Sequence, residues 1–278
     1  MQAKLYKGTR NISKEMSQYD ELVNMYNPDG SDLRNLQLRM LEILNVVDRI
    51  CRKHDIKYWL CGVTLLGAVR HGGFIPWDDD LDIEMMREDF IRFSEIIKDE
   101  LPDNLILHTS NIDPKYVYLY AKVRDVNSYV KEKCPVNQSF KYQGAFVDVF
   151  PREYALLSWC KIAAKLYNRL CFNLVLGTGF RFFLYVVFRK ALVNIVFPLF
   201  RVFSKFSNKR KICHTYGVGF YDAFESCDIF PLIEVNFEGG RYYAPNNCHV
   251  YLTKLYGDYM HIPEKKEIHV ENNLIKLW

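Results

Sequence analysis

Residues 74–83 read Phe74-Ile75-Pro76-Trp77-Asp78-Asp79-Asp80-Leu81-Asp82-Ile83. This stretch puts four carboxylates into five consecutive positions. A strand starting after Pro76 would place Asp78, Asp80 and Asp82 on one face and direct Ile83 into a core. Two like charges about 4 Å apart repel by roughly 4 kcal/mol at an effective dielectric of about 20. Three carboxylates on one face therefore call for a cation, and oxygen ligands without His or Cys suit Mg²⁺ or Mn²⁺.

The acidic run has two other interpretations. A solvated acidic turn is the simpler one, but Trp77 before the run and the apolar alternation after it argue against a fully exposed loop. An EF-hand is excluded by position. Counting from Asp78, the sixth residue is Ile83 and the twelfth is Asp89, where a calcium loop needs Gly and Glu.

The segment upstream of the run predicts a buried strand at 56–61 and a short helix at 64–71, joined by a turn at Gly62. A strand, a glycine turn and a helix N-terminus make an anion site, because free backbone N–H groups of the first helical turn point at the ligand. Asp80 follows Gly62 by only 18 positions. A glycine turn for phosphate followed by Asp-x-Asp for metal is the minimal plan of a nucleotidyltransferase fold.

The same residues resemble a known family. The similarity is carried by Gly62 to Ile83, Val147-Asp148-Val149-Phe150-Pro151, Phe237-Glu238-Gly239 and Tyr256-Gly257-Asp258-Tyr259-Met260. These stretches resemble the LicD family, bacterial phosphocholine transferases related to the fukutin-type ribitol-phosphate transferases. The resemblance spans roughly residues 36–270. One departure is Val63, where family members commonly carry a second Gly.

A third carboxylate is expected from a neighbouring strand. The segment 145–150 is apolar except for Asp148, and a buried lone carboxylate needs a partner, for which the site metal is the natural choice. Asp80, Asp82 and Asp148 are therefore the expected metal ligands. Asp78 either joins the metal shell or takes the proton of the attacking hydroxyl group.

The segment 116–124 alternates, so that one strand face would carry Tyr116, Tyr118, Tyr120, Lys122 and Arg124. Aromatic rings that end in two cations could bind a base and its phosphates; an ordinary solvated strand face is the alternative. The family resemblance favours Lys122, because a basic residue recurs there. The expected phosphate-binding residues are Gly62, Thr64, Arg70, His71, Lys122 and Arg124.

The composition allows a sizeable core, with 49% hydrophobic residues in 278. Its eight cysteines contain no C-x-x-C pair, which predicts reduced thiols in a cytoplasmic protein. The polar residues 1–11 contain no apolar signal core.

The charge is distributed unevenly. Residues 154–221 contain eleven Lys or Arg and no Asp or Glu, whereas the whole chain carries a net charge of +4. The longest uncharged run there, Leu170 to Phe180, has eleven residues, too few to span a bilayer. Apolar stretches broken by cations suit helices in a membrane interface, and a packed insert is the alternative. Nucleic-acid binding is not expected, because the basic stretch is apolar and aromatic.

These observations predict an α+β fold with a nucleotidyltransferase-like mixed sheet, flanking helices and a basic, apolar helical insertion. The expected parts are a polar segment (1–30), the catalytic core (31–152), the insertion (153–220) and a C-terminal part that completes the catalytic domain (221–278). Residues 154–211 are expected to contact the inner face of the cytoplasmic membrane.

The function that the resemblance implies is transfer of a phospho-alcohol from a CDP-linked donor such as CDP-choline to a hydroxyl group of a glycan or a lipid-linked glycan. A glycosyltransferase with an Asp-x-Asp metal site and a non-catalytic membrane-surface protein are the alternatives.

Overall fold

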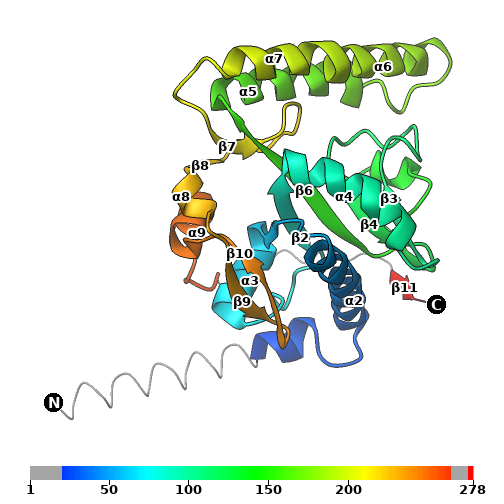
Figure 1. Cartoon of the computed structure of the whole chain (residues 1–278). Coiled ribbons are helices and arrows are strands. Elements are labelled where there is room, and N and C mark those ends of the chain that lie inside the picture. The colour runs from blue at the N-terminus through cyan, green and yellow to red at the C-terminus, as the bar shows by residue number, and fades with distance from the viewer. Residues whose placement is uncertain (1–20, 264–274, 278) are drawn as a thin grey trace.

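A seven-stranded mixed sheet forms the centre of the molecule (Figure 1). The computed structural model describes residues 21–263 and 275–277, so that residues 1–20 of the expected polar segment lie outside the described part. The strands of this sheet are β1 (Tyr58–Leu60), β2 (Asp82–Met86), β3 (Leu105–His108), β4 (Ala121–Asp125), β6 (Phe146–Ala155), β7 (Lys211–His214) and β8 (Ala223–Phe224).

Strand β6 is the centre of the sheet. One of its edges pairs in parallel with β2, which in turn pairs antiparallel with β1. Its other edge is divided, because residues 146–149 pair with β4 and residues 152–155 pair with β7. Strand β3 extends the sheet beyond β4, and β8 extends it beyond β7. The mixed sheet confirms the predicted fold class.

Helices cover the sheet on both sides. They are α2 (Asp32–Lys53), α3 (Gly62–His71), α4 (Arg87–Glu100), α5 (Leu157–Tyr167), α6 (Phe180–Ala191), α7 (Phe197–Ser204), α8 (Ser226–Ile229) and α9 (Cys248–Tyr256). Helices α2 and α4 contact the sheet strands, and α3 contacts β2 and α9. Two small ladders complete the fold, β9 (Ile233–Phe237) with β10 (Gly240–Ala244) and β5 (Ser128–Val130) with β11 (Ile275–Leu277).

Ser31 as a capping residue and the apolar residues at helical spacing after it predict a helix, which the structure confirms in α2. Ser31 accepts a hydrogen bond from the backbone N–H of Arg34, which satisfies one free donor of the first turn. The buried face of α2 repeats at helical spacing, with Leu36, Met40, Ile43, Leu44, Val47 and Ile50 all nearly inaccessible to solvent. The eight cysteines, all within the described residues, are free, as expected.

The predicted strand at 78–83 is corrected by the structure. The strand begins only at Asp82, and residues 78–81 form a loop. The N–H of Asp78 closes a turn on the carbonyl group of Ile75, and Gln37 donates to the carbonyl groups of both residues. The carbonyl groups of these residues therefore already accept hydrogen bonds and are not available for pairing with a neighbouring strand.

The predicted strand at 116–124 is also shorter than expected, because β4 begins at Ala121. The carbonyl group of Val117 accepts a hydrogen bond from the hydroxyl group of Tyr167 on α5. The backbone of Tyr116 bonds to that of Asp113. Residues 116–120 therefore pack against the insertion and do not extend the sheet.

The insertion forms a separate helical layer, seen along the top of Figure 1. The chain leaves β6, forms α5 and a long helix, and returns through β7. The long helix runs from Phe180 to Ser204 and joins α6 to α7 through a π-helical turn at Leu192–Val196. By length and composition it is apolar enough to cross a membrane, which the count of uncharged residues did not anticipate.

Candidate active site

Three charged side chains lie side by side across three neighbouring strands. Asp82 on β2 is in register with Asp148 on β6, which is in register with Lys122 on β4. Residues paired in register project from the same face of a sheet. The Nζ atom of Lys122 lies 2.7 Å from Oδ1 and 2.8 Å from Oδ2 of Asp148. The pairing of the strands thus brings together residues that are up to 66 positions apart.

The remaining carboxylates come from the loop before β2, which two distant side chains hold in place. Gln37 on α2 donates to the carbonyl group of Asp78 at 2.9 Å. Glu238, in the turn between β9 and β10, accepts the N–H of Phe74 at 3.0 Å and forms a salt bridge of 2.7 Å with Arg34. The loop that carries Asp78 and Asp80 is therefore fixed by contacts from both ends of the chain.

Burial and, after it, mutual repulsion raise the pKa values of the carboxylates. Burial, followed by the charges of Asp80, Asp82 and Asp79, raises the pKa of Asp78 well above its usual range. Burial and the charges of Asp80 and Asp148 do the same for Asp82. Burial raises the pKa of Asp148 to about 6, although Lys122 opposes the shift. Among the described residues, Lys122 supplies one positive charge next to the two carboxylates Asp82 and Asp148, so it does not balance both of them.

This arrangement fits a divalent cation. Its donors are all carboxylate oxygens, which Mg²⁺ and Mn²⁺ prefer. The Oδ2 atom of Asp78 is buried and has no hydrogen-bond partner among the described residues. A cation among these oxygens would remove the mutual repulsion that raises their pKa values.

The glycine turn is tied directly to the acidic strand. The N–H of Cys61 donates to the carbonyl group of Asp82 at 3.2 Å, and the N–H of Asp82 donates to Oγ1 of Thr64 at 2.9 Å. Gly62 has a φ of +54°, and a Cβ atom added there would lie 3.3 Å from Oδ2 of Asp82. Glycine is therefore favoured both by the backbone conformation and by the close carboxylate. The structure gives Thr64 a positioning contact with β2.

Arg70 and His71 are not brought to the carboxylates. They lie at the opposite end of α3, about 12 Å along the helix from Gly62. Arg70 donates to the carbonyl groups of Tyr259 and His261 at 2.9 and 3.1 Å. His71 lines a separate cavity of about 340 Å³. Burial and the neighbouring Arg70 charge lower the pKa of His71 to about 4.

Arg124 is also engaged elsewhere. It is fully buried, donates to the carbonyl group of Gly144 at 3.0 Å and forms a salt bridge of 2.6 Å with Glu132. Of the two cations predicted on this strand, only Lys122 touches a carboxylate of the acidic site.

An aromatic pocket opens beside Lys122. It forms where β4 and β7 both diverge from the edge of β6, next to Phe150, and has a volume of about 210 Å³. The pocket is lined by Tyr118, Leu119, Tyr120, Tyr167, Asn168, Phe172 and residues 217–220. The ring centroid of Tyr120 lies 4.4 Å from that of Phe150 and 5.8 Å from Nζ of Lys122. Of the three tyrosines predicted on one strand face, Tyr118 and Tyr120 line the pocket, whereas Tyr116 is buried in the hydrophobic cluster beside it. The insertion contributes Tyr167, Asn168 and Phe172.

Sequence reasoning missed Tyr256 at the end of α9. Its hydroxyl oxygen would lie 3.8 Å from a Cβ atom at Gly62. Burial and the charges of Cys61, Asp82, Asp78 and Asp80 raise the pKa of Tyr256 well above its usual range. The only signal in the sequence was the resemblance at 256–260, because a single tyrosine has no recognisable pattern.

A second polar cluster, also missed, adjoins the site on the same strands. Glu84, His214 and Asp222 offer ligand atoms within 4.8 Å of one another. Arg152 lies among them and forms salt bridges with both carboxylates, so its guanidinium group already occupies the position of a cation. Trp59 and Tyr251 donate to Oε2 of Glu84 at 2.8 and 3.2 Å. We therefore interpret this cluster as a buried structural network.

Comparisons with known proteins agree with this geometry. A family model described as the LicD/FKTN/FKRP nucleotidyltransferase domain matches residues 55–156, which include the glycine turn, the acidic run, Lys122 and Asp148. The lipopolysaccharide cholinephosphotransferase LicD of Haemophilus influenzae is 29% identical over 253 residues, or 84% of this chain and 94% of the relative.

Two other relatives match over shorter stretches but with higher sequence identity. The human ribitol 5-phosphate transferase FKRP is 56% identical over 34 residues, which cover 12% of this chain and 7% of the relative. An uncharacterised protein of Rickettsia prowazekii, RP689, is 42% identical over 78 residues, 28% of each chain. Residues 55–156 thus match the nucleotidyltransferase domain of the LicD/FKTN/FKRP family, and the chain is similar to one LicD protein over most of both lengths.

Proposed function

We propose a specific reaction for this LicD-type transferase: transfer of a phospho-alcohol group, phosphocholine-like, from a CDP-linked donor to a hydroxyl group of a glycan or glycolipid. The observation that carries the proposal is the row of Asp82, Asp148 and Lys122 next to the Gly62 turn. This row combines an anion site with a cation site, as phosphoryl transfer requires. The similar proteins named above support it, since one is a cholinephosphotransferase and another a ribitol 5-phosphate transferase.

Asp80, Asp82 and Asp148 would hold Mg²⁺ or Mn²⁺, which when bound neutralises phosphoryl oxygens and the leaving group. The protein's own groups supply the rest. The backbone N–H groups of the first turn of α3 bind a phosphate oxygen, and Lys122 adds a fixed positive charge beside Asp148. Asp78 completes the carboxylate shell or accepts the proton of the attacking hydroxyl group.

The donor class and the metal requirement can be tested together. Purified protein and a glycan acceptor with free hydroxyl groups are incubated with CDP-choline, CDP-ribitol, CDP-glycerol or a sugar nucleotide, and the released nucleotide is identified by chromatography. We expect CMP to be released from a CDP-linked alcohol only with Mg²⁺ or Mn²⁺, and chelation to abolish the reaction reversibly. Release of a nucleoside diphosphate from a sugar nucleotide would instead identify a glycosyltransferase. Full activity after exhaustive chelation would exclude the metal site.

The aromatic pocket is the proposed binding place for one end of the donor, the base or the alcohol head group. An aromatic contact with a base contributes about 1–3 kcal/mol, and a cation over a ring contributes about 0.5–2 kcal/mol. We expect Phe172→Leu to raise the KM for the donor about 5-fold or more and to change kcat little. The control is Phe203→Leu, on the exposed face of α7. An unchanged KM in Phe172→Leu would exclude the pocket from donor binding.

A further inference from the structure

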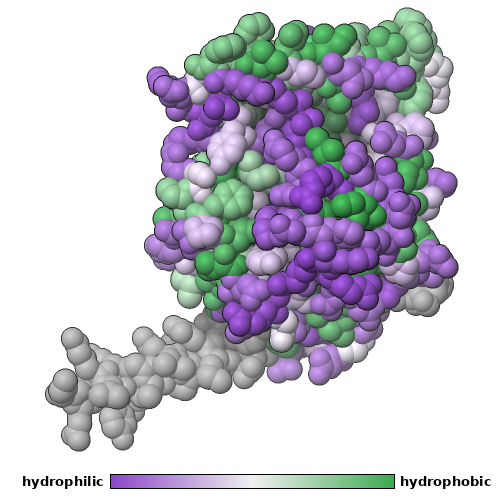
Figure 2. Space-filling view, viewed as in Figure 1, coloured by the Kyte–Doolittle hydropathy of each residue, from purple (hydrophilic) through white to green (hydrophobic). Residues whose placement is uncertain are grey.

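The long helix of the insertion exposes large apolar side chains along one side. The set consists of Phe180, Phe183, Val187, Ile195, Leu199, Val202, Phe203 and, just beyond the helix, Phe206. Their exposed fractions range from 42% for Val187 to 84% for Phe206, and only 17% of the most apolar window of the helix is buried. We call this set the apolar stripe. Figure 2 shows hydrophobic residues along the upper edge, where Figure 1 places α6 and α7.

The π-helical turn keeps the stripe on one side. In a regular α-helix, Ile195 would stand about 80° around the axis from Val187, eight residues earlier. A π-helical turn holds more residues per turn, so residues after Leu192–Val196 are rotated back toward the line of Phe183 and Val187. The two helical halves therefore share a continuous apolar surface.

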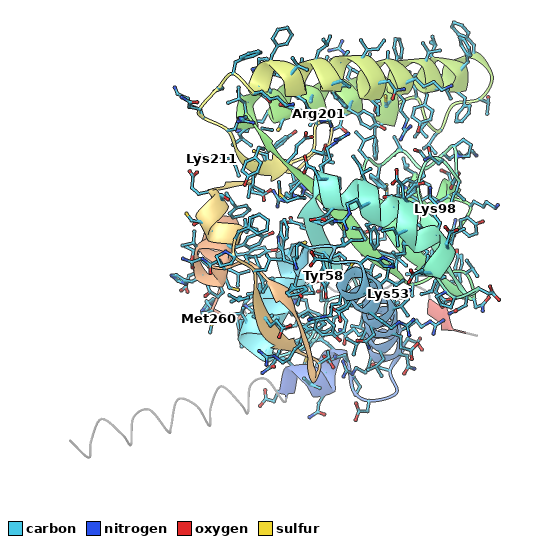
Figure 3. The ribbon with its side chains drawn as sticks, in the orientation of Figure 1. Lys53, Tyr58, Lys98, Arg201, Lys211 and Met260 are labelled. Atoms are coloured by element: carbon cyan, nitrogen blue, oxygen red, sulfur yellow. The ribbon has the colours of Figure 1, made fainter. Side chains whose placement is uncertain are left out.

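The opposite side of the helix is fixed to the rest of the protein. Tyr185, Leu192 and Phe197 are buried in a hydrophobic cluster shared with α5 and residues 116–117. Arg201 forms a salt bridge of 2.6 Å with Glu153 on β6, and its label in Figure 3 lies between the upper helix and the sheet. The helix therefore lies along the catalytic part and does not project from it. This geometry suits a helix lying in a membrane interface and opposes one that crosses the bilayer.

The charge of the layer is positive throughout. Residues 154–221 contain no Asp or Glu. Their exposed cations are Lys161, Lys165, Arg169, Arg181, Lys190, Lys205, Lys209, Arg210 and Lys211. A second copy of the chain packed stripe to stripe would bring two such sets of cations together. An anionic surface is the complementary partner.

We propose that the apolar stripe docks on a lipid bilayer that contains anionic head groups, with the helix lying parallel to the membrane plane. The apolar side chains enter the interface, and the cations contact the head groups. The insertion also contributes Phe172 to the aromatic pocket, so docking holds the catalytic site close to the membrane surface. This inference does not depend on the proposed reaction.

Flotation with vesicles tests the proposal. Full-length protein is mixed with phosphatidylcholine vesicles, with or without phosphatidylglycerol, at low and high salt. We expect the protein to float with the anionic vesicles, and less at high salt. Changing Phe180, Phe183 and Phe206 to Ser should abolish flotation under all conditions. The matched control changes Met25, Ile91 and Met260 to Ser, which are 53%, 40% and 55% exposed on the catalytic part, and should float like the native protein.

A variant with fewer positive charges measures the electrostatic contribution to membrane binding. It changes Lys161, Lys165, Arg181, Lys190 and Lys205 to Gln and keeps Arg189 and Arg201, which bond to Ser110 and Glu153. Its flotation should be weaker and should depend less on salt, because four of the exposed cations remain. Unfolding curves check that each variant is folded. The proposal is overturned if native protein stays at the bottom at low salt or if the Ser variant floats normally. It is also overturned if light scattering shows a dimer that the Ser variant dissociates.

Discussion

Replacing Asp82 by Asn, or Asp80 by Asn, should lower the transfer rate by roughly 10²- to 10³-fold or more, the range for losing a group that stabilises transition-state charge. Asp82 is in register with Asp148 and its N–H is held by Thr64, so the substitution changes charge without moving the strand. The rate of CMP release with saturating donor is the measurement. Asp79→Asn is the control, because it removes one charge from the same run at a position without an assigned role.

The same substitution should not destabilise the protein when metal is removed. The folded-state pKa of Asp82 is raised well above its ordinary value of about 3.9. Its contribution to stability is therefore fully present below about pH 4 and is lost as the pH rises through the folded-state pKa. In chelator, Asp82→Asn should raise the melting temperature more at pH 8 than at pH 5. It should also remove the stabilisation that Mg²⁺ gives the native protein.

Two results would contradict this assignment. A variant that turns over at nearly the native rate would show that Asp82 is not needed for transfer. A variant that melts well below the native protein in chelator would show that the aspartate is a structural residue.

Replacing Arg152 by Met should destabilise the protein by about 3–5 kcal/mol, the range for breaking a buried ion pair. Arg152 is 1% exposed and binds both Glu84 and Asp222, so its loss leaves two carboxylates without their cation. Burial by itself would raise the pKa of Asp222, but the charges of Arg152 and His214 hold it below its usual range. At about 2–4 °C per kcal/mol, the melting temperature should fall by roughly 6–20 °C.

The matched control for this variant is Arg52→Met. Arg52 also contacts two carboxylates, Asp48 and Glu234, but it lies at the surface with a third of its side chain exposed. We expect its loss to change stability by about 1 kcal/mol or less. The double variant Arg152→Met with Glu84→Gln should recover part of the stability, because it removes one unpaired charge. Equal losses for the two arginine variants would contradict the buried network.

The sequence predicts best those helices and turns whose boundaries are set by residues close to them in the chain. The apolar spacing of residues 87–100, followed by Pro102, predicts a helix, and the structure has α4 at Arg87–Glu100. The turn residues Glu238-Gly239-Gly240 between two strand-like segments predict a hairpin, and the structure forms β9–β10 there with Glu238 and Gly239 both at positive φ. These features depend on local spacing and backbone freedom, which the sequence shows directly.

The sequence predicted less well where strands begin and which basic side chains reach the acidic site. Residues 78–81 and 116–120 alternate like strands, but side chains from α2 and α5 take their carbonyl groups. Arg70 lies only eight positions after Gly62 in the sequence, but it stands at the opposite end of α3 from the glycine turn. Alternation reports which residues share a face, but it does not report whether a neighbouring strand is available.

The sequence by itself determined the resemblance to the LicD family, the acidic run, the glycine turn and the basic, apolar insertion, because each depends on residues that are adjacent in the chain. Only the tertiary structure decided that Asp148 and Lys122 stand beside Asp82, since strand register depends on packing between distant segments. It also decided that Arg152 neutralises Glu84 and that the insertion completes the aromatic pocket. Such contacts form only when burial and pairing free energies across the whole sheet favour one arrangement of the chain.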